Sequence, residues 1–229
     1  MSTGWLLLLI AVLVSVAVAL RALYRACMRA NRVDWGRGWM NFLDGLNRLF
    51  CYRYHRLNVA GIRLPKTGGA IVVSNHISGL DPMLLIASAR RPLRFMIARE
   101  QYERFGLKWL FRAVGTIPVD RQSRPERALR DALAALQAGE VIALFPHGKI
   151  HLDSDPPKRL KPGVAWLAQQ TGAGIYPARI TGVSRPGHVL TPVIIRSQAK
   201  IAFFRALDGD GKSVREITTE LGDILSPSD

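Results

Sequence analysis

The hydrophobic pattern sets the beginning of the chain apart from the rest. Residues 4–20 are apolar almost without interruption, and at ~1.5 Å per residue they would form a helix about 25 Å long. This is slightly shorter than the ~30 Å hydrocarbon core of a bilayer, so the segment has nearly the length needed to cross a membrane. No basic residue precedes it, which is not typical of a cleaved signal peptide.

A group of arginines follows this segment at spacings that place them on one helical face, and they are Arg21, Arg25, Arg29 and Arg32. Because basic residues flank membrane segments on the cytoplasmic side, we expect the rest of the chain on the cytoplasmic face. A second segment, residues 35–50, carries Trp, Phe and Leu along one stripe. Such a stripe suits a helix at a membrane interface or a core helix of the globular domain. We therefore predict N-terminal membrane-associated helices within residues 1–50.

Short apolar runs alternate with amphipathic stretches through residues 51–229, which we expect to form one domain. The runs predicted as strands are residues 56–64, 70–74, 92–98, 114–119, 141–145, 175–180, 192–196 and 200–204. The predicted helices are residues 82–89, 102–110, 123–139, 162–171 and a last helix that begins at Ser213. This alternation predicts an α/β fold: a mainly parallel, mixed sheet flanked by helices, with an N-terminal membrane-embedded helical segment.

The expected helix ends carry recognisable signals. Ser123 with Glu126, and Ser213 with Glu216, have the spacing of a capping box that opens a helix. Gly172 is placed to end the helix that begins near residue 162. These signals fix the expected boundaries of three helices.

The charge and composition of the chain limit the classes of partner that it is expected to bind. The net charge is +15, and 48% of the 229 residues are hydrophobic, which indicates anionic partners and a membrane rather than a wholly aqueous surrounding. No nucleic-acid motif is present, and the aromatic residues are not interleaved with basic ones as in a stacking platform. Cys27 and Cys51 have neither zinc-site spacing nor the number needed for a disulfide framework.

The stretch with the clearest chemistry is the end of the predicted strand 70–74. It continues as Asn75-His76-Ile77-Ser78 and reaches Asp81-Pro82, where we expect Asp81 to cap a helix that begins at Pro82. In open α/β folds, ligands bind at the carboxyl ends of strands. A histidine with a nearby carboxylate can remove a proton from a hydroxyl group. The alternative is that Asp81 only caps the helix and His76 is an ordinary loop residue.

This stretch also carries a family resemblance. Asn75-His76-x-Ser78-x-x-Asp81 resembles block I, N-H-x-S-x-x-D, of the glycerolipid acyltransferase family, which includes the lysophosphatidic acid acyltransferases. The resemblance implies that His76 and Asp81 are the catalytic residues. It also implies that the N-terminal helices dip into one leaflet, whereas the hydropathy alone leaves spanning equally open.

Further stretches follow in the order of that family. Residues 115–121 resemble block II, residues 145–148 resemble block III and residues 175–178 resemble block IV, with Lys161-x-Gly163 in between. The chain departs from the family at His147, where block III usually has Glu, and at Lys149-Ile150, where Thr-Arg usually follows. We expect this departure to affect the identity of the acceptor more than the type of reaction.

The blocks and their chemistry define an expected substrate site. Arg121 has the planar fork that clamps a phosphate, although it could instead be a surface residue paired with Asp120. The residues expected to bind substrate are Asn75, Ser78, Arg121, Phe145, Pro146, His147, Gly148, Lys149, Lys161 and Pro177. A metal site at His147, His151, Asp153 and Asp155 is a less favoured alternative, because Pro146, Gly148 and the Asp-Pro-Pro run disfavour a helix there.

The resemblance implies a membrane-bound O-acyltransferase. Its donor would be a thioester of acyl-CoA or acyl carrier protein, its acceptor the hydroxyl of a lysophospholipid such as lysophosphatidic acid, and membrane lipids its surroundings. No bound cofactor or metal is expected, because a thioester is already activated. The alternatives are another acceptor, such as glycerol-3-phosphate or an ornithine-type lysolipid, and a non-enzymatic basic protein that only binds membranes.

Overall fold

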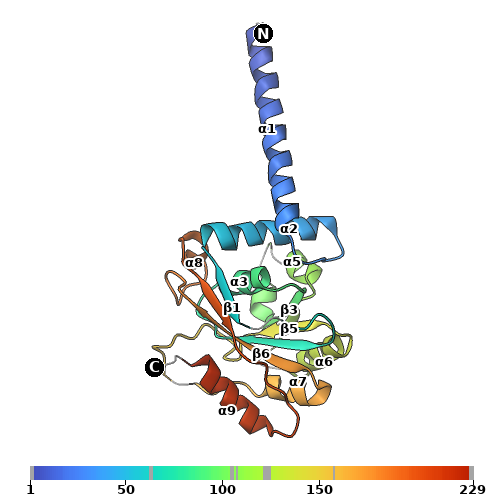
Figure 1. Ribbon diagram of the computed structural model, residues 1–229, viewed down its shortest axis with the longest axis vertical. Helices are drawn as coiled ribbons and strands as arrows, with labels where there is room; N and C mark the ends of the chain where they lie inside the picture. Colours follow the sequence, from blue (N-terminus) through green and yellow to red (C-terminus); the bar gives the residue numbers. More distant parts are fainter. Residues whose placement is uncertain are drawn as a thin grey trace.

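The computed structural model describes residues 3–61, 64–103, 106, 108–120, 125–156 and 158–226. A long helix, α1 (Thr3–Ala30), projects from one end of an α/β domain (Figure 1). Along α1 every side chain from Gly4 to Leu20 is exposed, and Cys27 near its foot is buried. The apolar segment is therefore helical, as predicted, and lies outside the core of the domain.

The described residues form a seven-stranded sheet with the order β1-β7-β6-β2-β5-β3-β4. Its strands are β1 (Asn58–Gly61), β2 (Ala70–Ser74), β3 (Leu93–Ala98), β4 (Ile117–Val119), β5 (Val141–Leu144), β6 (Gly174–Thr181) and β7 (Lys200–Phe203). All neighbouring strands run parallel except β6 and β7, which are antiparallel. The predicted mainly parallel, mixed sheet is confirmed.

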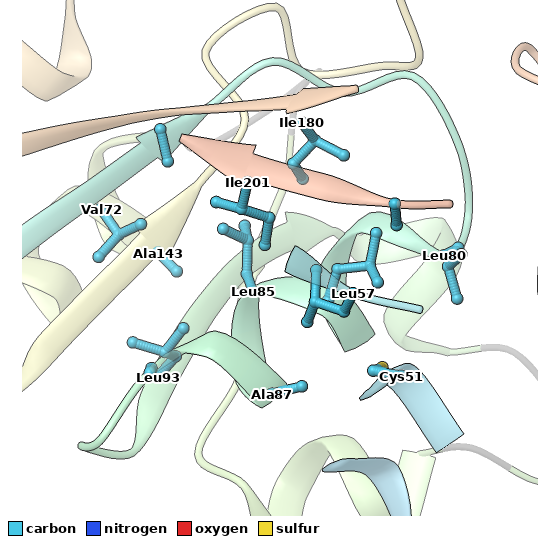
Figure 2. Close-up of a cluster of buried hydrophobic side chains, with 14 of the residues drawn as sticks. Cys51, Leu57, Val72, Leu80, Leu85, Ala87, Leu93, Ala143, Ile180 and Ile201 are labelled. Atoms are coloured by element: carbon cyan, nitrogen blue, oxygen red, sulfur yellow. The ribbon is translucent and has the colours of Figure 1, made fainter. Parts of the chain in front are cut away.

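β2 lies at the centre of the sheet, and all of its residues are buried. Val72 belongs to the core on one face, together with α3 (Asp81–Ser88), and Figure 2 shows this cluster around Leu85 and Ile201. Val73 belongs to the core on the other face, which α6 (Pro125–Gln137), α7 (Gly163–Thr171) and α9 (Val214–Leu225) cover. A strand buried on both faces requires a continuous apolar run, which explains the sequence AIVV.

α2 (Gly38–Leu49) joins α1 to the domain. Its Gly45 lies against α1 so closely that a Cβ there would be 1.9 Å from the carbonyl oxygen of Cys27. On the domain side, buried Arg48 bonds to Asp44 at 2.6 Å and donates to the carbonyl oxygens of Ala87 (2.7 Å) and Ala89 (2.6 Å). These last carbonyls of α3 have no partner within their own helix, so Arg48 fastens the N-terminal helices to the domain.

The structure differs from the predicted elements in two places. Residues 102–110 are not one helix, because α4 (Arg99–Tyr102) and α5 (Lys108–Ala113) are separate and Gly106 between them has a left-handed φ of 82°. Residues 192–196, predicted as a strand, overlap the short helix α8 (Thr191–Ile194). β6 already has β2 and β7 on its two sides, so this β-branched stretch finds no free edge there, and Pro192 suits the first turn of a helix.

The predicted start of α9 is confirmed. Ser213 Oγ accepts from the backbone N–H of Glu216 at 3.2 Å, and the Glu216 carboxylate accepts from the backbone N–H of Ser213 at 2.7 Å. Ser123, the other expected cap, lies outside the described residues. Gly172 ends α7 in the left-handed conformation, with φ 65°.

Candidate active site

Asn75 fixes the point at which the chain leaves β2. Its side-chain oxygen accepts from the backbone N–H of Ile180 at 2.7 Å, and its amide nitrogen donates to the carbonyl oxygen of Ile180 at 2.9 Å. Asn75 is buried, and Ile180 belongs to the neighbouring strand β6. This pair of bonds therefore holds the start of the next loop in one place relative to the sheet.

His76 and Asp81 are in direct contact. His76 Nδ1 lies 2.8 Å from Asp81 Oδ2, which also accepts from the backbone N–H groups of Ile77 (2.7 Å) and Ser78 (2.8 Å). Asp81 Oδ1 accepts from Ser78 Oγ at 2.6 Å, and the Asp81 side chain is fully buried. A carboxylate only accepts hydrogen bonds, so Nδ1 carries the proton and Nε2 is the basic nitrogen.

The expectation that Asp81 caps the following helix is wrong. α3 begins at Asp81 itself, with Leu80 in the capping position and no side-chain cap. The carboxylate turns back onto the preceding loop instead, where it satisfies two backbone N–H groups, a hydroxyl and an imidazole. This burial among donors gives Asp81 an orienting role toward His76 that a capping residue would not have.

Phe145 holds the face of the imidazole. Its ring stacks on that of His76 with centroids 4.0 Å apart and an interplanar angle of 12°. β5 ends at Leu144, which lies opposite Val73 of the parallel strand β2, so the residues that follow the two strands meet at the same edge. Asp81 and Phe145 therefore restrain the ring from two sides, while 18% of the His76 side chain stays exposed.

The turn after Phe145 gathers positive charge. Gly148 donates its backbone N–H to Phe145 at 2.9 Å and has a left-handed φ of 73°, a conformation in which glycine is favoured. Lys161 bonds to the carbonyl oxygen of buried Pro146 through its backbone N–H at 3.2 Å. A Cβ on Gly148 would lie 3.1 Å from Lys161 Nζ, so this lysine, like exposed Lys149, lies beside the turn.

His147 has a different environment from His76. Its ring stacks on that of His151 with centroids 4.3 Å apart, and its buried Nδ1 has no hydrogen-bond partner among the described residues. Burial lowers the pKa of His147, and electrostatic interactions with His151, Lys158 and His76 lower it further. His147 is therefore neutral near pH 7, and any positive charge it adds to the site appears only in acid.

The remaining expected site residues are spread over different environments. Asn75, Ser78 and Pro177 are buried, and Pro177 lies within β6 opposite Val73. They support the corner from inside the protein. Arg121 lies outside the described residues.

The residues of the alternative metal site are held by other contacts. Asp153 pairs with Arg179 at 2.6 Å, and Asp155 lies 3.6 Å from His151 Nδ1. Among the residues that the structure describes, no three His, Cys, Asp or Glu side chains are grouped so that they could hold a metal ion.

The structure adds one segment that the sequence patterns did not bring to the site. Gly187 donates its backbone N–H to the carbonyl oxygen of Ile77 at 2.8 Å, and Gly79 donates to that of His188 at 3.1 Å. A Cβ on Gly79 would lie 2.1 Å from the carbonyl oxygen of Val189. The glycine inside the motif was therefore the signal for a close backbone approach, although it does not say which segment approaches.

The family follows from a comparison with known proteins. A family model described as Acyltransferase matches residues 56–181, more than half of the 229-residue chain. This chain therefore belongs to the Acyltransferase family, and the match includes both the His76 corner and the turn at Gly148.

Curated relatives point the same way. The 1-acyl-sn-glycerol-3-phosphate acyltransferase of Bacillus subtilis is 24% identical over 122 residues, which are 53% of this chain and 60% of that protein. The protein of the same description from Borreliella burgdorferi is 25% identical over 119 residues, 51% of this chain and 47% of that protein. An uncharacterized protein of Mycobacterium leprae is 31% identical over 161 residues, 64% of this chain and 42% of that protein. The chain thus aligns with 42–60% of the length of these relatives.

A solved structure shares the fold. The 1-acyl-sn-glycerophosphate (LPA) acyltransferase PlsC from Thermotoga maritima matches with a TM-score of 0.60 at 19% identity, over 86% of this chain and 85% of that chain. At this identity the likeness shows a common arrangement of helices and sheet, including the α/β architecture predicted from the sequence.

Proposed function

We propose that this protein is a membrane-attached O-acyltransferase that moves a fatty acyl group from a thioester donor to the hydroxyl of a lysophospholipid. The observation that carries the proposal is the 2.8 Å bond between His76 Nδ1 and the buried carboxylate of Asp81. It orients an imidazole whose other nitrogen is free to act as a base at the carboxyl end of β2. The relatives described as 1-acyl-sn-glycerol-3-phosphate acyltransferases support the choice of reaction.

The proposed reaction begins with proton removal. Nε2 of His76 accepts the proton of the acceptor hydroxyl while the hydroxyl oxygen bonds to the thioester carbonyl carbon. Asp81 stabilises the imidazolium that forms and keeps the ring in its orientation. The tetrahedral intermediate then collapses, the carbon–sulfur bond breaks, and the imidazolium returns the proton to the departing sulfur. The products are a new ester and a free thiol.

We assign the binding of an anionic acceptor to the turn beyond β5. Lys149 and Lys161 are exposed beside Gly148, and a phosphate next to two ammonium groups is favourable. Arg121 is proposed as a further phosphate ligand from the sequence motif. The acyl donors acyl-CoA and acyl carrier protein are also acidic, which suits a chain of net charge +15.

The membrane is proposed as the surroundings of this site. In the described part of the chain, α1 is the one helix that is long and apolar enough to cross a membrane. Arg21, Arg25 and Arg29 follow its apolar part, which favours the cytoplasmic face for the catalytic domain. Residues 1–50 would then be the membrane part, and residues 51–229 the acyltransferase domain. A protein held this way resists extraction by molar salt, because salt screens charge but leaves apolar insertion in place.

A second acceptor class is favoured by one observation. His147, with its lowered pKa, is a neutral group where the family pattern has Glu, so the acceptor hydroxyls meet a different partner in this site. Glycerol-3-phosphate and ornithine-type lysolipids are the alternatives to lysophosphatidic acid. A non-enzymatic protein that only binds membranes is the remaining alternative.

Transfer of a radiolabelled acyl group separates these possibilities. Purified full-length protein is incubated with acyl-CoA or acyl carrier protein thioester and with each acceptor in turn, and the lipid products are separated. We expect labelled phosphatidic acid from lysophosphatidic acid, and none from the His76→Ala variant. Labelling of a different acceptor would reassign the substrate, and no transfer to any acceptor from either donor would reject the enzyme.

A further inference from the structure

Exposed apolar side chains are concentrated on one end of the molecule. In the described part of the chain, every large hydrophobic residue that is strongly exposed lies on α1 or in a few segments near its foot. Those outside α1 are Trp39 and Leu46 of α2, Tyr52 and Tyr54, Trp109 of α5, and Val189, Leu190, Ile194 and Ile195 at α8. Such a one-sided apolar surface marks a place of interaction.

We propose that α8 and its neighbours Leu190 and Ile195 form a second point of insertion into the membrane interface, in addition to α1. The partner is the headgroup and upper acyl region of an anionic bilayer. This proposal concerns residues that are more than 150 positions from α1 in the sequence, so no apolar pattern at the N-terminus accounts for it.

α8 is built as a fixed apolar projection. Pro192 is buried and Val193 packs against the core, while Leu190 and Ile194 are 68% and 71% exposed. The turn is held by bonds from the N–H of Val193 to Leu190 (3.0 Å) and from the N–H of Ile195 to Thr191 (2.9 Å). Leu190 and Ile194 therefore project outward from an anchored turn. Their exposure to water is unfavourable, and their transfer into lipid would be favourable.

α8 lies beside the segment that follows α2. The hydroxyl of Tyr54, just beyond α2, donates to the carbonyl oxygen of Ile194, and Arg196 Nε donates to the carbonyl oxygen of Tyr54 at 3.1 Å. Toward the other end of α2, Trp39 lies 5.6 Å from Trp109 of α5, centroid to centroid. α2 thus lies across the foot of α1 with α8 and α5 near its two ends (Figure 1).

The length of α1 places α2, α5 and α8 at the level of the membrane interface. From Gly4 to Tyr24 the helix measures about 30 Å, which equals the hydrocarbon core if the Arg21 side chain reaches up to the headgroups. Arg25 and Arg29 then lie among the headgroups, and α2 follows at that level. Tyr and Trp, which line α2 and its two ends, are enriched at this depth.

Charge favours a lipid over a protein partner. Residues 156–207, which contain α8, include eight Lys or Arg and no Asp or Glu. Arg185 and Arg196 on either side of the turn are exposed. Each basic residue near an anionic membrane contributes about 1 kcal/mol of attraction, and an apolar tip between arginines fits the boundary between acyl chains and phosphates.

The segment also reaches the His76 corner. Gly187 and His188 bond to the backbone of Ile77 and Gly79 at 2.8 and 3.1 Å, so insertion of α8 would set the corner against the membrane. This last consequence rests on the proposed function, because it gives an acceptor that stays in the bilayer a short path to His76. The membrane contact itself does not depend on catalysis.

Quenching by brominated lipids tests the contact directly. Full-length Ile194→Cys is labelled with an environment-sensitive fluorophore and placed in phosphatidylcholine–phosphatidylglycerol vesicles with bromine on the acyl chains. The matched control is Thr219→Cys, an exposed site on α9, which is far from α1 in Figure 1. The native Cys27 and Cys51 are buried, and labelling of the unsubstituted protein checks that they do not react.

We expect strong quenching and a blue shift at position 194 and little change at position 219. Equal, weak quenching at both positions would overturn the proposal, because the domain would then hang from α1 away from the lipid. A blue shift at position 194 that appears in detergent only when a second protein is added would also overturn the proposal, because α8 would then bind a protein and not lipid. These readouts do not involve turnover, so they stand even if the proposed function fails.

A kinetic test asks whether the contact serves catalysis. In the double variant Leu190→Ser with Ile194→Ser, KM for an acceptor presented in vesicles should rise at least ~10-fold, since two exposed aliphatic side chains no longer enter lipid. The kcat, and the constants for a short-chain acceptor dissolved in water, should stay unchanged. An unchanged KM in vesicles would separate the membrane contact from substrate access and reject that part of the proposal.

Discussion

Two histidines follow neighbouring parallel strands of this protein, and their surroundings are opposite. His76 follows β2 and bonds through Nδ1 to the buried carboxylate of Asp81 at 2.8 Å. His147 follows β5, stacks on His151, and has a buried Nδ1 without a hydrogen-bond partner among the described residues. The position at a strand end is shared, but the partner is not.

The difference shows that the partner, more than the residue type, decides what a histidine can do. A carboxylate fixes the tautomer of His76 and prepares it to accept a proton. Burial, together with electrostatic interactions with neighbouring groups, lowers the pKa of His147 and keeps the ring neutral near pH 7, and leaving its Nδ1 unpaired costs about 1–3 kcal/mol. A buried polar atom kept at such a cost needs a reason, and binding of the acceptor is the reason we propose.

Removal of the oriented base should have the largest effect. His76→Ala should lower kcat at least ~100-fold, because general base catalysis typically contributes 100- to 10,000-fold. The measurement is the initial rate of acyl transfer at saturating donor and acceptor, with thermal unfolding as a check on the fold. His188→Ala, an exposed imidazole nearby, is the control. Near-normal turnover by folded His76→Ala would show that His76 is not the catalytic base, and the proposed difference in role between His76 and His147 would be rejected.

Loss of the orienting charge should come next. Asp81→Asn keeps an oxygen that can accept from the N–H groups of Ile77 and Ser78, but it no longer stabilises the imidazolium, so we expect kcat to fall by about 100-fold. Asp81→Ala should also unfold more easily, because each N–H left unpaired costs about 1–3 kcal/mol. Turnover and the unfolding midpoint are measured on both variants. If Asp81→Asn has the kcat of the wild type, the carboxylate is only structural.

Substitution at the second histidine should be milder and should act on binding. His147→Glu places a negative charge where an anionic acceptor is proposed to lie, and a repulsion of about 1 kcal/mol at ~4 Å in water corresponds to a ~5- to 10-fold rise in KM. The kcat should change little, since the interaction exists in both ground and transition states. His147→Gln, neutral like the native imidazole, should keep a near-native KM. A large fall in kcat at constant KM would make His147 a catalytic residue instead.

The smallest expected effect is a change in how stability depends on pH. The folded pKa of His147 is lowered by burial, so below its ordinary value of about 6.5 the unfolded chain binds more protons than the folded one. The contribution is fully present above pH ~6.5 and is lost as the pH falls toward the lowered folded value. His147→Gln should therefore flatten the dependence of the unfolding midpoint between pH 8 and 5.

His55 provides a check on this interpretation. Its pKa is also lowered by burial, against a bond to the carbonyl oxygen of Val193, so His55→Gln should flatten the same curve independently of the site. Parallel curves for wild type and His147→Gln would show that burial does not lower the pKa of His147.

Much of the architecture was predictable because it depends on local pattern. The continuous apolar run 70–74 is β2, and the capping box at Ser213 opens α9. The motif from Asn75 to Asp81 placed His76 at a strand end, since it follows the apolar run 70–74 directly in the sequence. The prediction that His76 and Asp81 act on substrate remains for the kinetic tests above.

The sequence by itself thus determined which stretches are apolar enough to be buried, where α9 begins, and which residues stand at the end of β2. Only the tertiary structure decided that Asn75 bonds to Ile180 and that residues 191–194 form a helix with Leu190 exposed beside it. The physical reason is range. Propensity and capping act over a few residues, whereas the direction of a side chain is set by partners that are up to 105 positions away, and free sheet edges exist only once the sheet has formed.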